Sequence, residues 1–449
     1  MNHMQRPPLP SDYLRPAGEH PLVESVLVQE EFVRFKIRLG FSSSFCQTFE
    51  EGAERLLDEI GPRPGTHPGL ADANPVTALI QCDAEESPSA DVRRGIVEFG
   101  VSAREFPDRT GLPLILALAS YVSAFSFIYE YQVMDILFPR DMLQSDMFPG
   151  PKFGPSLLKG EGSARLGVII KPRFISDLSF LRQFVSDAAQ SGIDYLTDDE
   201  LTVANRDIPF RVRVEEVVGI LRNAAESYGH RPAYITNIAG DFEGAMERAA
   251  IAQELGADGV MVNYYAMGYD VISTLARDLK FKLGIVANGL GLGVLTQGPL
   301  FRVSTELICR LARLAGADAV YTGPMVGLID SSRHSAAQFR RALTQPYGRD
   351  CRRPAAVAMM SGGIGLPELL RNDALYRGPL CLSMGYQFSE PRLRGIPAQI
   401  IVECIRTVWE AVRSGGLDQG RAAVQLLAKS GKHYRECLVE IRAEEAVSR

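Results

Sequence analysis

A repeated turn between predicted helices and strands is the sequence feature that most constrains the fold. The segments 192–194, 256–258 and 316–318 have the pattern Gly-Ile/Ala-Asp, and each lies between a stretch of helical periodicity and a short apolar run. Glycine commonly ends a helix in the left-handed conformation, and aspartate stabilises the turn that follows. Helices that lead so regularly into buried strands predict a parallel sheet made of β/α units.

Eight short apolar runs after residue 165 are the expected strands of this sheet. Segments of helical length and period, such as 214–228, 242–255 and 305–315, lie between most of them. Eight strand–helix units in about 250 residues favour a (β/α)8 barrel over an open doubly wound sheet. The expected strands are 166–170, 195–197, 234–238, 259–263, 283–287, 319–322, 355–360 and 380–384.

The preceding residues have a mixed pattern. An alternating run at 33–39, a helix-like segment at 48–60 and strand-like runs around 76–82 and 95–106 indicate an α+β domain.

A Pro- and Gly-rich connector at 148–155 marks the approach to the boundary between these patterns. We therefore predict an α/β protein with a smaller N-terminal α+β domain over 22–145 and a TIM barrel domain over 150–440. Residues 398–446 are expected to be helical and to pack on the barrel.

One uncharged run could be mistaken for a membrane span. Residues 111–129 carry no charge over 19 positions, which is close to the length of a spanning helix. Its Ser and Tyr residues, Pro113, and the lack of a flanking Lys/Arg cluster favour a buried helix between the two domains.

Composition excludes several classes of partner and compartment. The net charge is -6 and no dense basic stripe occurs, so neither nucleic acid nor an anionic membrane is expected as a main partner. The seven cysteines are scattered and form no CxxC motif, which argues against a disulfide framework or a zinc site and favours a reducing cytoplasm. The polar, Pro-rich start predicts no signal peptide.

The active site of such a barrel lies at the carboxyl ends of its strands. The first strand is followed by Lys171-Pro-Arg173. An amine removed from water beside a second cation can act as a base near neutral pH. The alternative is a lysine that extends its amine to solvent and pairs with an acid on the next strand.

Three consecutive acids, Asp198, Asp199 and Glu200, follow the second strand. Carboxylates at a strand end can supply oxygen ligands to Mg²⁺. They are also frequent as solvated residues at the start of a helix.

The late strands end in segments that are typical of phosphate sites. Ser361, Gly362 and Gly363 offer a hydroxyl and backbone N–H groups, although a tight turn alone would need the same glycines. The run 288–293 has the spacing GxGxG rather than GxGxxG, so NAD is not expected. The six histidines avoid the strand ends, which argues against histidine base chemistry and histidine-bound zinc, and haem is not expected either.

These segments together resemble the large subunit of RuBisCO, ribulose-bisphosphate carboxylase/oxygenase. The resemblance rests on 148–155, on Gly167-Val-Ile-Ile-Lys-Pro-Arg173, on Gly192-Ile-Asp-Tyr-Leu-Thr-Asp-Asp-Glu200, and on the later Ser361-Gly-Gly363. It covers about residues 110–415.

The resemblance implies proton abstraction beside a ketone and an enediolate held on Mg²⁺. It makes Lys171 the catalytic base, and Asp199 and Glu200 the metal-binding carboxylates. Ser361, Gly362 and Gly363 match the family's substrate and phosphate contact region. The other predicted substrate-binding residues, taken from their positions at the strand ends, are Arg173, Asn288, Ser383 and Gly385.

Several departures from the family pattern are large. Thr197 replaces the lysine that the family carbamylates as the third Mg²⁺ ligand, and Asn288 and Gly289 replace a His and an Arg. Tyr321 replaces a His, and Leu328 replaces the lysine that steers CO2.

Because of these departures, this chain is not expected to carboxylate ribulose bisphosphate. They point to a RuBisCO-like protein of the non-fixing form IV kind. The resemblance implies C–C bond chemistry on a phosphorylated keto sugar acid, with 3-oxo-isoapionate 4-phosphate transcarboxylase/hydrolase or decarboxylase as the favoured activity. A Mg²⁺-dependent sugar-phosphate enolase or isomerase, and a catalytically silent binding module, are the alternatives. Family analogy also predicts a homodimer that binds a small phosphorylated metabolite.

Overall fold

The computed structural model describes residues 32–61, 76–87, 89–106, 111–157, 164–203, 206–327, 336–346 and 353–448. These residues form two compact units. The first takes its described residues from 32–148, 291–308 and Pro346, and the second takes the remainder.

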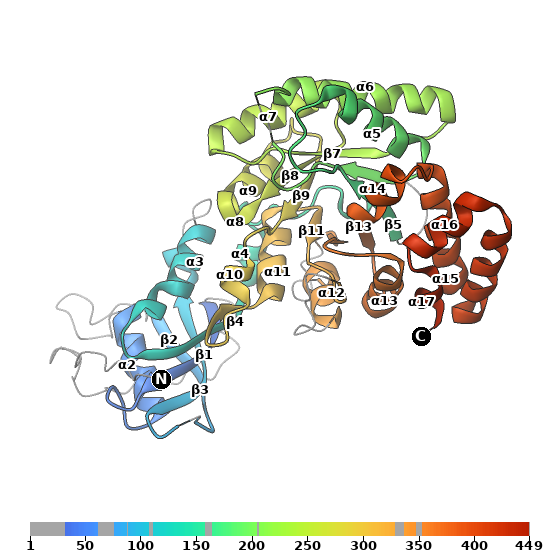
Figure 1. Ribbon diagram of the computed structural model, residues 1–449. Helices are drawn as coiled ribbons and strands as arrows, with labels where there is room; N and C mark the ends of the chain where they lie inside the picture. The colour runs from blue at the N-terminus through green and yellow to red at the C-terminus, as the bar shows by residue number, and fades with distance from the viewer. Residues whose placement is uncertain are drawn as a thin grey trace. The chain divides into compact units, whose positions relative to one another are not determined.

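The first unit is built on a five-stranded sheet. Strand β1 (Phe32–Ser42) pairs antiparallel with β3 (Val92–Ser102) and β4 (Ile128–Leu137), and β2 (Thr77–Glu85) forms the edge beside β3. Helix α2 (Phe49–Ile60) contacts β2 and β3, as Figure 1 shows in blue. The α+β prediction for this part of the chain is confirmed.

A strand from much later in the chain completes this sheet. Strand β10 (Phe301–Val303) pairs parallel with β4, and the amide of Tyr131 donates a further hydrogen bond to the carbonyl of Leu300 (2.9 Å). The sequence analysis placed these residues in the barrel domain. Three residues are too few to show a strand period, so sequence alone gave no sign of this pairing.

The uncharged run 111–129 is not one buried helix, and that prediction was wrong. Helix α3 (Gly111–Tyr121) ends halfway along the run, a 3-10 turn follows at Val122–Ala124, and β4 begins at Ile128. Leu114 and Tyr121 of α3 are exposed, at 47% and 54%. In the described part of the chain, no helix is long and apolar enough to cross a bilayer.

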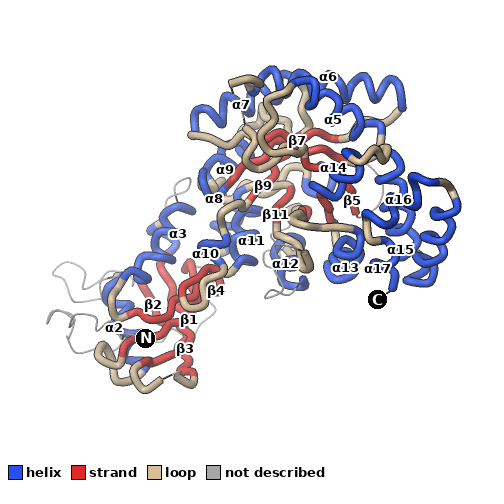
Figure 2. Tube along the Cα trace, in the orientation of Figure 1, coloured by secondary structure: helices blue, strands red, loops and turns tan. Residues whose placement is uncertain are grey.

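The second unit is a closed barrel of eight parallel strands, which confirms the predicted TIM barrel. The strands close in the order β11-β12-β13-β5-β6-β7-β8-β9 (Figure 2, in red). They are β5 (Ala164–Ile169), β6 (Tyr195–Thr197), β7 (Ala233–Asn237), β8 (Gly259–Asn263), β9 (Gly284–Asn288), β11 (Ala319–Tyr321), β12 (Val357–Met360) and β13 (Leu380–Met384).

The barrel helices follow the strands as expected for β/α units. They are α5 (Leu178–Gln190), α6 (Phe210–Tyr228), α7 (Phe242–Leu255), α8 (Tyr264–Met267), α9 (Asp270–Arg277), α11 (Thr305–Ala315), α12 (Ala336–Thr344), α13 (Leu366–Tyr376) and α14 (Tyr386–Leu393). The predicted C-terminal helical segment is α15 (Ala398–Lys429), α16 (Lys432–Glu440) and α17 (Ala443–Ser448). Shorter pieces are α4 (Arg140–Gln144), α10 (Gly293–Thr296) and the 3-10 turns at Ala103–Glu105 and Gly154–Leu157.

The three Gly-x-Asp turns join neighbouring strands at the amino end of the barrel. Asp194 precedes β6 and accepts a hydrogen bond from the Leu166 amide of β5 (2.7 Å). Asp258 precedes β8 and accepts from Tyr234 of β7 (2.9 Å) in the same way. Asp318 precedes β11 and accepts from the Ile285 amide of β9 (2.9 Å). A short carboxylate thus reaches the strand beside its own, at the end of the barrel opposite the candidate active site.

Replacement of Asp318 by asparagine should destabilise the barrel. The buried carboxylate accepts hydrogen bonds from the amides of Phe153 (2.5 Å), Gly154 (2.8 Å) and Ile285 (2.9 Å). An asparagine amide group cannot accept at both positions, so we expect a loss of about 1–3 kcal/mol in the free energy of unfolding. Urea denaturation measures it.

Asp241→Asn is the matched control, because asparagine caps a helix as well as aspartate does at this exposed N-cap of α7. An equal loss in both variants would contradict the role assigned to Asp318.

Candidate active site

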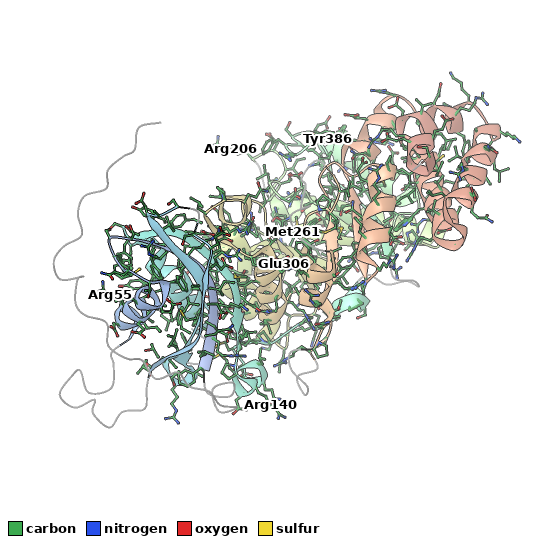
Figure 3. The ribbon with its side chains drawn as sticks, turned by 90° about the horizontal axis from the view of Figure 1, so that it is seen from below. Arg55, Arg140, Arg206, Met261, Glu306 and Tyr386 are labelled. Atoms are coloured by element: carbon green, nitrogen blue, oxygen red, sulfur yellow. The ribbon has the colours of Figure 1, made fainter. Side chains whose placement is uncertain are left out.

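The interior of the barrel changes from apolar to polar along the strands. The buried core includes Ile235, Met261, Val286, Ala319 and Met359, which face inward. Met261 is labelled in Figure 3. Because side chains alternate along a strand, the residue two positions further on faces inward as well. These residues at the carboxyl ends are Thr197, Asn237, Asn263, Asn288, Tyr321, Ser361 and Ser383, and we call them the barrel floor.

The barrel floor offers hydroxyl and amide groups, and Lys171, which follows β5, adds an amine. Lys171 is buried, with 6% of its surface exposed. Its Nζ donates a hydrogen bond to Oδ2 of Asp199, a residue that follows the neighbouring strand β6. The ring of Tyr386, labelled in Figure 3, has its centroid 5.8 Å from the Lys171 Nζ. Of the two sequence interpretations, pairing with an acid of the next strand is observed, but the amine does not extend to solvent.

Gly385, which directly follows β13, lies beside this lysine. A Cβ atom at Gly385 would lie 3.4 Å from Cε of Lys171, and no other atom would come within 4 Å. Gly385 therefore borders the lysine side chain, as expected for a residue of the site.

Asp199 is shared by two cations. Nε of Arg173 lies 3.4 Å from the same Oδ2 that binds Lys171, while Oδ1 of Asp199 accepts from the Leu201 amide (3.0 Å). The Asp199 side chain is fully buried, whereas that of Arg173 is 49% exposed. Arg173 can therefore contact both the buried carboxylate and a ligand that arrives from solvent.

Asp198 points into the protein and holds neighbouring strands together. Its carboxylate is buried and accepts hydrogen bonds from Arg213 (2.9 Å), the Tyr234 hydroxyl (3.0 Å), the Thr236 hydroxyl (2.8 Å) and the Asn237 amide (2.9 Å). Both of its oxygen atoms are thereby engaged, Oδ2 by three donors and Oδ1 by one. Asp198 is a structural residue.

Asn237 links this network to the two following acids. Its Nδ2 donates to the carbonyl oxygens of Asp199 (3.3 Å) and Glu200 (2.8 Å). Its Oδ1 accepts from the Ala239 amide (3.0 Å). The network around Asp198 therefore fixes the backbone that presents Asp199 and Glu200.

Glu200 lies close to the charged groups of the site. Burial is the main cause that raises the pKa of Glu200, and the negative charge of Asp199 raises it further. The charges of Lys171 and Arg173 lower it by less. The neutral form of this carboxyl is thus favoured relative to an exposed glutamate.

These carboxylates do not fit a Mg²⁺ ion held by the protein. Both oxygens of Asp198 already accept hydrogen bonds, and Asp199 is bound by two cations. Thr197, at the position of the expected third ligand, has only a neutral hydroxyl. Within the described ranges, no group of three His, Cys, Asp or Glu side chains could hold a metal ion. We therefore assign no step of the chemistry to a metal.

A cluster of hydroxyl groups occupies the centre of the barrel floor. The Tyr195 and Ser383 hydroxyls are hydrogen-bonded at 2.7 Å. The Tyr321 hydroxyl lies beside those of Ser383 and Thr197, which lower its pKa, although burial raises the pKa by more. Among the described residues, Oγ1 of Thr197 is buried without a hydrogen bond of good geometry.

The remaining predicted substrate-binding residues also lie at the strand ends. Asn288 accepts from the Leu290 amide through Oδ1 (2.8 Å), and its Nδ2 faces the weak acceptor Sδ of Met261 (3.6 Å). Gly362 and Gly363 have φ angles of 106° and 71°, so the tight turn that the sequence suggested is present after Ser361. Leu328 lies outside the described residues.

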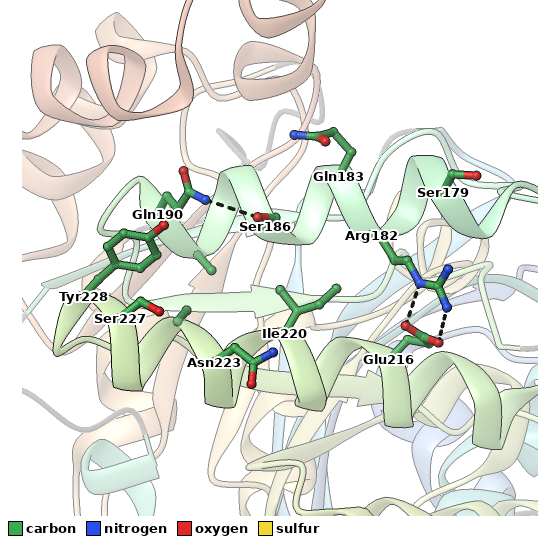
Figure 4. A pocket seen from close by; sticks show the side chains of 12 residues that line it. Ser179, Arg182, Gln183, Ser186, Gln190, Glu216, Ile220, Asn223, Ser227 and Tyr228 are labelled. Atoms are coloured by element: carbon green, nitrogen blue, oxygen red, sulfur yellow. Dashed lines mark hydrogen bonds and ion pairs between the residues drawn. The ribbon is translucent and has the colours of Figure 1, made fainter.

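A groove on the outer surface of the barrel is separate from this site. It lies between α5 and α6, has a volume of about 480 Å³, and is lined by residues such as Gln183 and Asn223 (Figure 4). Arg182 and Glu216 bridge it through two hydrogen bonds of 2.8 and 2.5 Å. The groove is formed by helices rather than strand ends, so we do not assign the chemistry to it.

Sequence reasoning missed two functional neighbours. Arg213, the partner of Asp198, belongs to helix α6, so reading only strand ends could not find it. Tyr386 directly follows Gly385, and its contact with Lys171 depends on the closure of the barrel between β13 and β5.

Comparison with known proteins agrees with this geometry. Residues 155–353 match the family described as ribulose bisphosphate carboxylase large chain, catalytic domain. This segment of the barrel is thus similar to the catalytic domain of that family. The RuBisCO resemblance inferred from the sequence is therefore confirmed.

Two curated relatives of this chain carry the name 2,3-diketo-5-methylthiopentyl-1-phosphate enolase. The protein from Geobacillus kaustophilus is 31% identical over 258 residues, which cover 54% of this chain and 60% of the relative. A Bacillus cereus protein is 30% identical over 260 residues, covering 57% and 61%. The chain thus spans about three fifths of the length of these relatives.

Solved structures share the fold. A rubisco-like protein from Alicyclobacillus acidocaldarius has a TM-score of 0.77 at 21% identity, covering 92% of this chain and 99% of the other. Octameric ribulose-1,5-bisphosphate carboxylase/oxygenase from Pyrococcus horikoshii has a TM-score of 0.78 at 17% identity, covering 96% and 98%. The arrangement of a barrel with an N-terminal sheet domain is common to all three chains.

Proposed function

We propose that this RuBisCO-like chain is an enzyme that removes a proton next to the carbonyl group of a small phosphorylated keto compound. The observation that carries the proposal is Lys171, a buried amine at the carboxyl end of the barrel that is bound to Asp199 and lies next to the neutral barrel floor. Buried titratable groups in such a position are typical of catalytic sites.

Lys171 acts as the general base and Asp199 as its counter-ion. The amine donates a hydrogen bond to Asp199 in the free protein, so it must first lose one proton to water while Asp199 stays ionised. It then accepts the proton from carbon while the electron pair of the C–H bond moves toward the carbonyl oxygen, giving an enolate. Asp199 stabilises the ammonium group that forms again in this step.

The surrounding residues match the proposed substrate class. The Ser361 hydroxyl and the Gly362–Gly363 turn would bind the phosphate through O–H and backbone N–H groups. Asn288 and Ser383 would hydrogen-bond oxygen atoms of the carbon chain, since the Nδ2 of Asn288 has only a weak acceptor at present. Relatives named as enolases of a phosphorylated diketone support this class.

A second candidate is cleavage of a carboxyl group from a phosphorylated β-keto acid such as 3-oxo-isoapionate 4-phosphate. The half-exposed Arg173 favours it, because a guanidinium beside Lys171 can hold a substrate carboxylate in two hydrogen bonds. Loss of CO2 from such an acid leaves the same kind of enolate that proton removal gives. The two candidates therefore use one site.

The test is deuterium exchange followed by NMR in D2O. The purified chain is incubated with 2,3-diketo-5-methylthiopentyl 1-phosphate or with 3-oxo-isoapionate 4-phosphate, each in Mg²⁺ and in EDTA. Exchange of the proton next to the carbonyl supports enolisation, and release of CO2 supports the second candidate. We expect activity to persist in EDTA, because the carboxylates do not fit a metal. A folded protein that leaves both compounds unchanged would contradict the proposal.

We also propose that the chain acts as a homodimer, which the family resemblance implies, and that it does so in the cytoplasm, which the scattered cysteines favour. Sedimentation velocity measures the dimer directly.

A further inference from the structure

We infer that the Tyr321 hydroxyl, seated between the hydroxyls of Thr197 and Ser383, donates the hydrogen bond that holds the substrate oxyanion. The family resemblance gives this role to Mg²⁺. The inference rests on the proposed function and names the group that stabilises its enolate.

The position of Tyr321 suits this role. Tyr321 is the last residue of β11, and it faces inward because Ala319, two residues earlier, belongs to the inner core. Thr197 ends β6, which is four strands away from β11 in the order of the closed barrel. Strands four apart stand on opposite sides of an eight-stranded barrel. A phenol that reaches from β11 to the Thr197 hydroxyl therefore lies near the barrel axis, at the centre of the floor.

Lys171 stands beside this cluster. It follows β5, which is the neighbour of both β6 and β13, the strands that carry Thr197 and Ser383. A substrate placed on the floor would thus have its carbonyl oxygen on the hydroxyl cluster and its acidic carbon toward the lysine amine.

The hydroxyl cluster has unused hydrogen-bonding capacity. Ser383 is already engaged with Tyr195, whereas Oγ1 of Thr197 is buried without a hydrogen bond of good geometry among the described residues. Buried polar groups are nearly always satisfied, so an orphan hydroxyl marks a place where a ligand oxygen or a water binds. The Tyr321 hydroxyl lies beside that place.

A neutral phenol in this environment is a strong donor to an oxyanion. Burial raises the pKa of Tyr321, so the group keeps its proton throughout the physiological range. Fixed donors in a site that excludes water stabilise developing negative charge far better than they do in water. No proton leaves Tyr321 in this step.

The reaction balances without a further reactant. The C–H bond breaks, its proton bonds to Nζ of Lys171, and its electron pair forms the C=C bond of the enolate. The π electrons of the carbonyl move onto oxygen, where the Tyr321 hydroxyl donates its hydrogen bond. Return of the proton from Lys171 to carbon reverses these changes.

The test removes single hydroxyl groups. Tyr321→Phe deletes the proposed donor and keeps the ring, while Tyr376→Phe is the matched control. Tyr376 is a buried tyrosine of α13, away from the strand ends, and its hydroxyl has no partner among the described residues. Two quantities are measured in EDTA: the rate of deuterium exchange, and the calorimetric affinity for phosphoglycolohydroxamate, a phosphorylated enolate analogue.

We expect Tyr321→Phe to lower the exchange rate by about 10²–10³-fold, as the loss of one oxyanion donor does in other enzymes. Affinity for the analogue should fall by roughly 10–100-fold, since a hydrogen bond to a charged group is lost. Tyr376→Phe should stay within about twofold of the parent in both measurements, given that its hydroxyl makes no bond.

Three outcomes would overturn the inference. Tyr321→Phe could keep both the rate and the affinity, or the parent could require Mg²⁺ for exchange and bind it in calorimetry without substrate. In either case the proposed function stands if Lys171→Met still abolishes exchange. If the parent exchanges neither compound, the affinity for the analogue decides. An unchanged affinity in Tyr321→Phe would contradict the donor role of Tyr321, and a reduced affinity would support it.

Discussion

Replacing Lys171 with methionine is expected to lower the rate of deuterium exchange by about 10³-fold, because general-base catalysis typically contributes 10²–10⁴-fold. Methionine has a similar length and fills the same buried space beside Gly385 and Tyr386, but it cannot accept a proton. NMR exchange with both substrates, in EDTA, measures the effect.

The experiment on Lys171→Met must separate the loss of the catalytic base from a loss of protein stability. Lys171→Met leaves Asp199 buried with Arg173 as its cation, so the free energy of unfolding should fall as well. The double variant Lys171→Met/Asp199→Asn removes the buried carboxylate charge and should recover stability without recovering exchange.

Lys152→Met is the matched control for loss of a lysine. Its Nζ donates to the backbone carbonyls of Leu275 (3.3 Å), Asp278 (2.7 Å) and Phe281 (3.0 Å), away from the strand ends. This variant should lose stability and keep its exchange rate. A folded Lys171→Met protein that exchanges at the parent rate would refute the assignment of the base.

The second large effect concerns the stability of the barrel. Arg213→Met should lower the free energy of unfolding by about 3–5 kcal/mol, the usual result when one partner of a buried ion pair is removed. Arg213 of α6 is buried, lies 2.9 Å from Oδ2 of Asp198, and packs against the ring of Phe210. Without it, the Asp198 carboxylate keeps only neutral donors.

Urea denaturation of the parent and of two further variants tests this estimate. Arg213→Met/Asp198→Asn removes both charges and should be more stable than Arg213→Met alone. Arg182→Met breaks the exposed pair with Glu216 in the outer groove and should leave the free energy of unfolding unchanged, because exposed ion pairs contribute little. Equal losses for Arg213→Met and Arg182→Met would show that burial of the pair does not matter.

Much of the fold could be predicted from local patterns. The repeated Gly-x-Asp turns mark strand starts, and the apolar runs end at the residues that form the barrel floor, so Lys171, Asn288 and Ser383 could be placed at one end of the barrel. The secondary structure of residues 111–129 could not be predicted correctly, because a uniformly apolar run has no period that separates helix from strand.

The partners within the site depend on contacts between distant segments. The sequence suggests that Lys171 could meet an acid of the next strand, but three consecutive acids follow that strand. The structure shows that Asp198 is engaged by its own hydrogen-bond network and that Asp199 is the acid that binds Lys171. Likewise, the composition of the hydroxyl cluster follows from barrel closure, which brings Tyr321 to Thr197.

The pairing of β10 with β4 has a consequence for how the chain is made. Translation proceeds from the N-terminus, so β4 emerges from the ribosome long before residues 301–303 do. Throughout that interval the edge of β4 exposes backbone N–H and C=O groups that can pair with another nascent chain. Chaperone binding to the nascent chain would be most valuable between the synthesis of β4 and that of β10, and a slow ribosome in this window would favour aggregation.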